Sequence, residues 1–180
     1  MLQRVFHLIA PILLFSSISP AQQAMADDPA KLLNHLAGRW VMTGTLGGKQ
    51  TTHDVDADSV LKGEYLRMHE VSREKDASGS PAYEAIVFLS WNTKLNQYTC
   101  MWLDNTAGGG LSPQGIALGP KAGDAVPLVF TISPHESLHT TFTYDAPTDS
   151  WRLTIDDVTD GEPERFGDVK LTRAGKADHS

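Results

Sequence analysis

The chain has 180 residues, with 15 basic and 22 acidic side chains, a formal net charge of −7 and a single cysteine. The acidic balance and the lack of a basic stripe in the sequence argue against nucleic acid or an anionic membrane as a partner. One cysteine cannot form an intrachain disulfide, so no such bond stabilises the fold.

Residues 1–26 have the layout of a secretory signal peptide. Arg4 precedes an apolar run over residues 5–15, and residues 24–26 read Ala-Met-Ala, a small-x-small cleavage site. The apolar run is shorter than the roughly 20 residues that a helix needs to cross a bilayer. We therefore expect an exported protein, periplasmic or secreted, with residues 27–180 forming one domain. An uncleaved anchor is the alternative.

One amphipathic helix is predicted at the start of the mature chain. Asp28 is placed to cap it, Pro29 suits its first position, and Gly38 stops it. Its apolar stripe consists of Leu32, Leu33 and Leu36.

The remainder reads as short strands separated by turns, with no strand–helix alternation that would indicate a parallel sheet. The pattern predicts an all-β fold, an antiparallel barrel of about ten strands with a short N-terminal helix. The expected strands cover residues 39–46, 49–60, 63–74, 83–92, 97–105, 111–119, 126–132, 138–145, 150–158 and 165–173.

The predicted hairpin over residues 83–105 is apolar on both faces. Val87 and Leu89 alternate with Ile86 and Phe88, whereas a barrel needs only one buried face. An apolar outer surface of this size calls for a cover. The N-terminal helix, the glycine-rich loop at 106–110 and a second subunit, which would make a homodimer, are the candidates.

The order of helix, Gly38-Arg39-Trp40 and strand resembles the Gly-x-Trp opening of lipocalins and other calycin barrels. In those barrels the tryptophan enters the first strand and closes one end. An arginine from a late strand often lies over it, where stacking and hydrogen-bond donation are both favourable. The resemblance implies Arg173 for this role, with Arg165 as the second choice.

A longer stretch, residues 30–173, resembles a bacterial domain-of-unknown-function family, DUF1579. The resemblance implies a calycin-like antiparallel barrel of up to ten strands and no established activity. Asn92 departs from the family, which usually has Asp after an aromatic residue there. The matching positions are Leu36, Gly38, Trp40, Gly63, Tyr65, Leu66, Tyr83, Glu84, Trp91, Tyr98, Trp102 and Asp104.

The candidate ligand site depends on which face of the strand at 63–74 points inward. If Tyr65, Arg67 and His69 face in, they form a polar cluster in which Arg67 can bind a ligand carboxylate. If Leu66 and Met68 face in, that cluster lies at the surface. His53 has the same ambiguity on the preceding strand. The predicted cavity residues are Tyr65, Arg67, His69, Trp91, Met101 and Trp102.

No cofactor is expected. Barrels resembling nitrobindins bind haem through a histidine on a strand near the C-terminus, but no histidine lies between Thr140 and Asp178 here. His139 is the nearest, and alternation directs it outward or into a polar cavity.

No metal or catalytic residue is expected either. His135 and His139 lie roughly 13 Å apart if both are on one strand, which is too far for one metal ion. Asp54, Asp56 and Asp58 fit a solvated outer face better than a calcium site. The sequence contains no recognisable nucleophile, zinc or nucleotide motif.

Three functional hypotheses follow. The first is an exported barrel that binds a small apolar or amphipathic molecule in its interior. The second is a non-enzymatic structural or partner-binding barrel that dimerises through the apolar hairpin. The third is a lyase or isomerase that uses Tyr65, Arg67 or His69 as polar groups.

Overall fold

Ten strands follow a short helix along the chain in the computed structural model, which describes residues 28–106 and 110–175. The predicted signal peptide lies outside these residues. The elements are α2 (Pro29–Asn34), β1 (Gly38–Leu46), β2 (Lys49–Val60), β3 (Tyr65–Ser72), β4 (Glu84–Asn92), β5 (Gln97–Asp104), β6 (Ile116–Gly119), β7 (Ala125–Thr131), β8 (Glu136–Asp145), β9 (Ser150–Thr159) and β10 (Glu162–Arg173).

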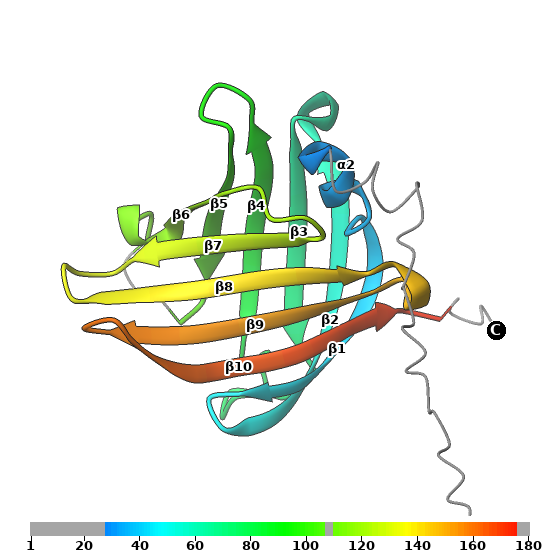
Figure 1. Ribbon diagram of the computed structural model, residues 1–180. Helices are drawn as coiled ribbons and strands as arrows, with labels where there is room; N and C mark the ends of the chain where they lie inside the picture. Colours follow the sequence, from blue (N-terminus) through cyan, green and yellow to red (C-terminus); the bar gives the residue numbers. More distant parts are fainter. Residues whose placement is uncertain (1–27, 107–109, 176–180) are drawn as a thin grey trace, which may run out of the picture.

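The strands form one closed antiparallel sheet (Figure 1). Each strand pairs with its neighbour in the chain, and β1 pairs with β10 so that Trp40 lies opposite Arg173. In Figure 1, β7–β10 run across the barrel at a steep angle to β2–β5, as the strand tilt of a closed barrel requires. The predicted fold class, an all-β antiparallel barrel of about ten strands with a short helix, is confirmed.

Tight turns join the strands at the end of the barrel away from α2. The β1–β2 turn at Gly47 and Gly48 has φ angles of 54° and 74°, and the β9–β10 turn at Asp160 and Gly161 has φ angles of 51° and 87°. Two consecutive positive φ angles are typical of type I′ hairpin turns, which favour glycine and aspartate. Within residues 28–106 and 110–175, this end consists of turns and loops, and no α-helix covers it.

Helix α2 fills the other end of the barrel (Figure 1). The Asp28 side chain caps it by accepting a hydrogen bond from the Lys31 amide at 3.3 Å. The three predicted leucines of its apolar stripe, Leu32, Leu33 and Leu36, are buried in the same core cluster as the barrel interior. The helix thus packs into the barrel end, and it is not the cover proposed above for the β4–β5 hairpin.

Trp40 and Arg173 close this end together. The Arg173 guanidinium carbon lies 3.7 Å from the centroid of the Trp40 ring. The Trp40 indole donates to the Leu36 carbonyl at 2.7 Å, and Arg173 donates to the carbonyls of Ala37 and His35 at 2.6 and 3.0 Å. Arg173 therefore occupies the place above the tryptophan.

Gly38 makes this closure sterically feasible. Its φ of +124° is strained for any residue with a side chain, and a Cβ there would lie 2.4 Å from Nη1 of Arg173. Arg165, the second choice for the covering arginine, pairs instead with Asp156 on the outer wall. The glycine, tryptophan and arginine thus form one interlocked unit.

The shortest ladder of the barrel is between β6 and β7. It has two residue pairs, Ala117 with Phe130 and Leu118 with Val129. In the described ranges, no helix has the length and hydropathy needed to cross a bilayer.

Candidate ligand cavity

The end of the barrel opposite α2 contains a cavity of about 340 Å³. The β1–β2 turn at its rim lies at the bottom of Figure 1, far from α2 at the upper right. Eight of the sixteen residues in the cavity wall are apolar or aromatic: Met42, Leu46, Ala82, Tyr83, Trp102, Leu153, Ile155 and Phe166.

Strand alternation brings polar groups from β2 into this cavity. Val55 and Ala57 are buried, so Thr51 and His53, at the same parity, also face inward. The aspartates at the other parity face outward and pair with arginines: Asp54 with Arg73, Asp56 with Arg39 and Asp58 with Arg67. These three aspartates form a solvated outer face and lie apart from the cavity.

Strand β3 supplies the partner of His53. Leu66 and Met68 face inward and are 4% and 1% exposed, which directs Glu70 and Ser72 inward as well. Val55 is paired with Glu70 across the two strands, so the histidine two positions away lies diagonally opposite the carboxylate. Glu70 Oε1 and His53 Nδ1 are hydrogen-bonded, and each side chain is 3% exposed.

A chain of hydrogen bonds continues from this pair to the rim. His53 Nε2 lies 2.7 Å from the Thr51 hydroxyl, which donates to Glu74 Oε2 at 2.9 Å. The backbone N–H of Thr52 donates to the other oxygen of Glu74 at 2.9 Å. Desolvation opposes the ionisation of Glu74, but hydrogen bonds from its own backbone N–H, the Thr51 hydroxyl and the Thr52 N–H outweigh it, so the pKa of Glu74 lies below its ordinary value.

Aromatic side chains flank the polar pair. The Tyr83 ring stacks on His53 with centroids 5.6 Å apart, and the Trp102 indole donates to the Tyr83 hydroxyl at 2.9 Å. Burial, and secondarily the charge of Glu70, raises the pKa of Tyr83 above its ordinary value. Tyr83 therefore remains a neutral phenol at physiological pH.

The order carboxylate, imidazole, hydroxyl in Glu70, His53 and Thr51 is that of a hydrolytic triad. The surroundings do not suit acyl transfer, however. The Glu74 carboxylate accepts a hydrogen bond from the Thr51 hydroxyl, so a negative charge lies beside the atom that would attack a carbonyl group. That charge would oppose an oxyanion forming nearby. The arrangement is better suited to binding a ligand than to splitting one.

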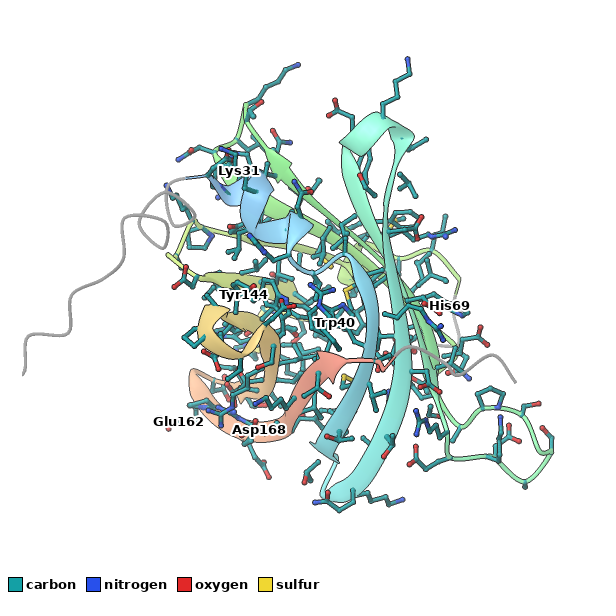
Figure 2. All side chains as sticks on the ribbon, turned by 90° about the vertical axis from the view of Figure 1, so that its right-hand side faces the viewer. Lys31, Trp40, His69, Tyr144, Glu162 and Asp168 are labelled. Atoms are coloured by element: carbon teal, nitrogen blue, oxygen red, sulfur yellow. The ribbon has the colours of Figure 1, made fainter. Side chains whose placement is uncertain are left out.

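The predicted cluster of Tyr65, Arg67 and His69 lies on the outer face of β3. Tyr65 is 42% exposed, Arg67 pairs with Asp58, and His69 pairs with Glu84 at 2.7 Å. Figure 2 shows His69 on the outer side of the barrel and Trp40 within it. The inward register is wrong because the apolar residues of β3 take the interior positions. The lyase or isomerase hypothesis, as built on these three residues, is wrong with it.

The three other predicted cavity residues are distributed differently. Trp102 faces in and lines the cavity. Trp91 packs edge-on against Tyr98, with centroids 5.0 Å apart, outside the set of residues that line the cavity. Met101 lies on the outer face of β5, opposite Phe88 on β4 and Ile116 on β6.

The residues that the sequence prediction missed are chiefly Glu70 and its neighbours Ser72 and Glu74. A usable signal existed: once Leu66 and Met68 face inward, Glu70 follows by parity. A carboxylate in that position requires a partner, and His53 is the histidine on the adjacent strand.

The late histidines lie away from the cavity. His135 pairs with Asp160 at 2.9 Å, and exposed His139 bonds to Ser137 at 3.0 Å on the outer side of β8. Among residues 28–106 and 110–175, no group of three histidine, cysteine or acidic side chains is placed to hold a metal ion.

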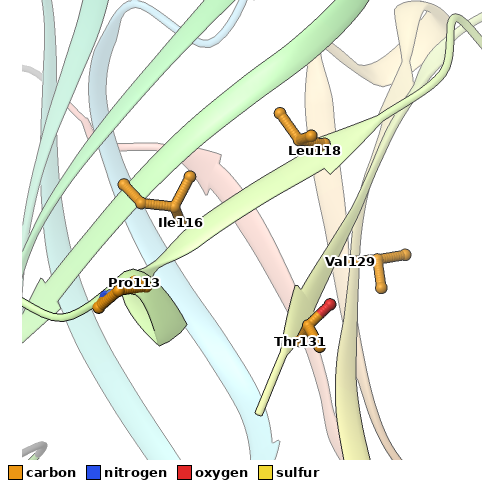
Figure 3. Close-up of a pocket in the computed structure, with 5 residues that line it drawn as sticks. All are labelled: Pro113, Ile116, Leu118, Val129 and Thr131. Atoms are coloured by element: carbon orange, nitrogen blue, oxygen red, sulfur yellow. The ribbon is translucent and has the colours of Figure 1, made fainter. Parts of the chain in front are cut away.

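A second hollow lies on the outer wall of the barrel, over β6 and β7 (Figure 3). It measures about 510 Å³ and is lined by Pro113, Ile116, Leu118, Val129 and Thr131. The last four come from the outward positions of the strands that form the shortest ladder. This hollow carries no ionisable side chain in its lining, unlike the cavity.

Comparison of the sequence with protein-family models gave no match, and comparison with curated proteins gave none either.

Proposed function

We propose that this barrel binds a small amphipathic molecule in the cavity at its open end. The observation that carries the proposal is the combination of an apolar wall with a buried His53–Glu70 pair in one cavity of about 340 Å³. Sites for small molecules typically measure about 300–1,000 Å³ and combine apolar walls with a few convergent polar groups. A purely structural barrel would fill this space with side chains.

The division of the cavity surface indicates the form of the ligand. Met42, Leu153 and Ile155 offer contact to an apolar body, whereas Thr51 and Glu70 offer hydrogen bonds to one polar group. The open end gives the ligand a route from solvent that avoids the closed end with α2.

Native mass spectrometry of the gently desalted protein, purified from its natural host, tests the proposal. We expect a population with added mass that disappears on denaturation. Leu46→Trp places a larger ring in the cavity and should abolish the added mass. Leu118→Trp makes the same change in the outer hollow and should leave it intact. If Leu118→Trp loses the added mass and Leu46→Trp keeps it, the ligand site lies in the outer hollow and not in the cavity.

A second candidate function, dimerisation, has one observation in its favour. The apolar outer face of the β4–β5 hairpin continues onto β6 and β7, where Ile116, Leu118 and Val129 are 45%, 43% and 40% exposed. A second copy of the chain is the proposed cover for this face. Native mass spectrometry counts the subunits in the same measurement, and Leu118→Glu should convert a dimer to a monomer.

We also propose that the protein is exported, on the strength of the signal-peptide pattern in residues 1–26. Intact-mass measurement of protein from the periplasmic extract or the culture medium should give a chain that begins near Asp27. Membership of DUF1579 is likewise our proposal, and it rests on the order of the Gly38–Trp40 opening and the Tyr83–Asp104 hairpin.

A further inference from the structure

We propose that the ligand of this cavity is an organic cation, a protonated amine on an apolar body, held by Glu70. The inference rests on the proposed function and narrows its substrate class. Three features of the polar end carry it: the supply of acceptors and donors, the balance of charge, and the aromatic lining.

Glu70 is a buried carboxylate with spare accepting capacity. The residue is 2% exposed and lines the cavity. Its one hydrogen-bond partner in the described part of the chain is His53 Nδ1. A carboxylate removed from water is stabilised by several donors, and two oxygens accept more than one. A donor on a bound ligand would supply the further hydrogen bonds that the Glu70 carboxylate can accept.

The donors around the cavity are, by contrast, largely in use. Both ring nitrogens of His53 are engaged, one by Glu70 and one by Thr51. The indole N–H of Trp102 is directed to Tyr83, and the hydroxyl of Ser72 donates to the Glu74 carbonyl. The Tyr83 hydroxyl accepts from Trp102 and keeps its own proton to donate, but a ligand carboxylate would find few other donors at this end, whereas an ammonium group would find acceptors.

The charges point in the same direction. Glu70 is the buried carboxylate of the lining, whereas the second carboxylate, Glu74, lies exposed at the mouth. Lys49 is exposed at the mouth as well, and solvent screens its charge and that of Glu74, so Glu70 sets the sign of the charge inside the cavity. A cation entering the cavity is attracted and an anion repelled.

Aromatic rings complete the environment that favours an ammonium group. Tyr83, Trp102 and Phe166 all line the cavity. The faces of such rings attract cations, most strongly where water is excluded. Tyr83 additionally stacks on His53, which fixes one ring next to the acidic end.

The test uses three probes with one chain and different headgroups: octylammonium, octanol and octanoate, measured by isothermal titration calorimetry on the purified protein at neutral pH. We expect octylammonium to bind about tenfold or more tightly than octanoate, with octanol between them, as one charge-assisted hydrogen bond would give. Octanoate binding as tightly as octylammonium would overturn the inference and leave the proposed function standing. Binding of none of the three would overturn both.

Glu70→Gln keeps the shape of the side chain and removes its charge. We expect it to weaken octylammonium about tenfold while octanol binding stays within twofold, roughly. Glu84→Gln, which removes a carboxylate from the outer face of the barrel, is the matched control and should change neither. The ranking of the three probes on the unaltered protein does not depend on either variant folding. If Glu70→Gln binds octylammonium as tightly as the unaltered protein does, Glu70 does not hold the ammonium group.

Discussion

The two ends of this barrel treat buried polar groups in opposite ways. At the closed end, the Trp40 indole and the Arg173 guanidinium donate to the carbonyls of Leu36, Ala37 and His35. At the open end, two glutamates and a histidine share few donors around an unfilled space. The Trp40–Arg173 unit at the closed end is thus satisfied within the protein, although the Tyr98 hydroxyl and one Asp124 carboxylate oxygen are buried without a hydrogen-bond partner in the described residues. At the open end, by our proposal, a ligand supplies the missing donor.

The closed end should therefore contribute most to stability, whereas the open end contains the residues that we propose bind a ligand. A buried ion pair contributes little to stability, and replacing it with apolar residues of similar size is often neutral or stabilising. The closed end, where a ring packs under a guanidinium and a helix, is where truncation should be most costly. Truncation at the closed end should therefore lower the free energy of unfolding, whereas apolar replacement of the whole His53–Glu70 pair at the open end should leave it level or raise it.

Trp40→Ala should have the largest effect. The ring is 1% exposed and lies beneath Arg173, so its loss leaves a cavity and an unpaired carbonyl at Leu36. We expect the free energy of unfolding to fall by about 3–5 kcal/mol, measured by urea denaturation. Trp40→Phe keeps a ring but not the indole donor, and it should cost less than Trp40→Ala. If Trp40→Ala is nearly as stable as the unaltered protein, the closed end is not the main source of stability.

The double variant His53→Leu with Glu70→Leu should change stability in the other direction. It replaces a pair whose side chains are each 3% exposed with two apolar side chains. We expect the free energy of unfolding to stay level or rise by about 1–4 kcal/mol, with loss of octylammonium binding. His53→Leu alone leaves Glu70 buried without its partner and should be destabilised. A double variant clearly less stable than the unaltered protein would show that the pair supports the fold.

Asp149→Asn should have the smallest effect, and the effect should depend on pH. Hydrogen bonds from Arg173 hold the pKa of Asp149 below its ordinary value. A carboxyl group with a lowered folded-state pKa stabilises the fold above its unfolded pKa, and that contribution disappears as the pH falls through the folded value.

The unaltered protein should therefore exceed Asp149→Asn in stability at pH 7 by less than about 1 kcal/mol, because the pair is partly exposed. Asparagine also tolerates the φ of 44° at this position. Urea denaturation at pH 7 and pH 3 should show the gap narrowing at the lower pH. A gap that widens there would contradict the assigned direction of the pKa shift.

Much of the closed end was predictable because its signals are local. Asp28 and Pro29 mark the start of α2, and Gly38 and Trp40 mark the entry to β1. The late arginine was harder to assign, since Arg165 and Arg173 both lie on β10. Only the pairing of Trp40 with Arg173 across β1 and β10 distinguishes them.

The residues that line the open end could not be predicted from local signals in the sequence. On β3, each face mixes polar and apolar residues, so alternation alone left the register undecided. Burying Glu70 is unfavourable by itself and becomes acceptable only through His53, on a strand whose register is set by the barrel. The cavity also depends on β1, β5, β9 and β10, which meet there only in the closed sheet.

Gly38 has a consequence for how this protein would vary among relatives. Any side chain at position 38 would displace the Arg173 guanidinium, which in turn covers Trp40. The three positions are therefore under joint constraint, although they come from opposite ends of the chain. In an alignment of relatives, we expect them to be kept together or lost together, so that a substitution at one position predicts substitutions at the other two.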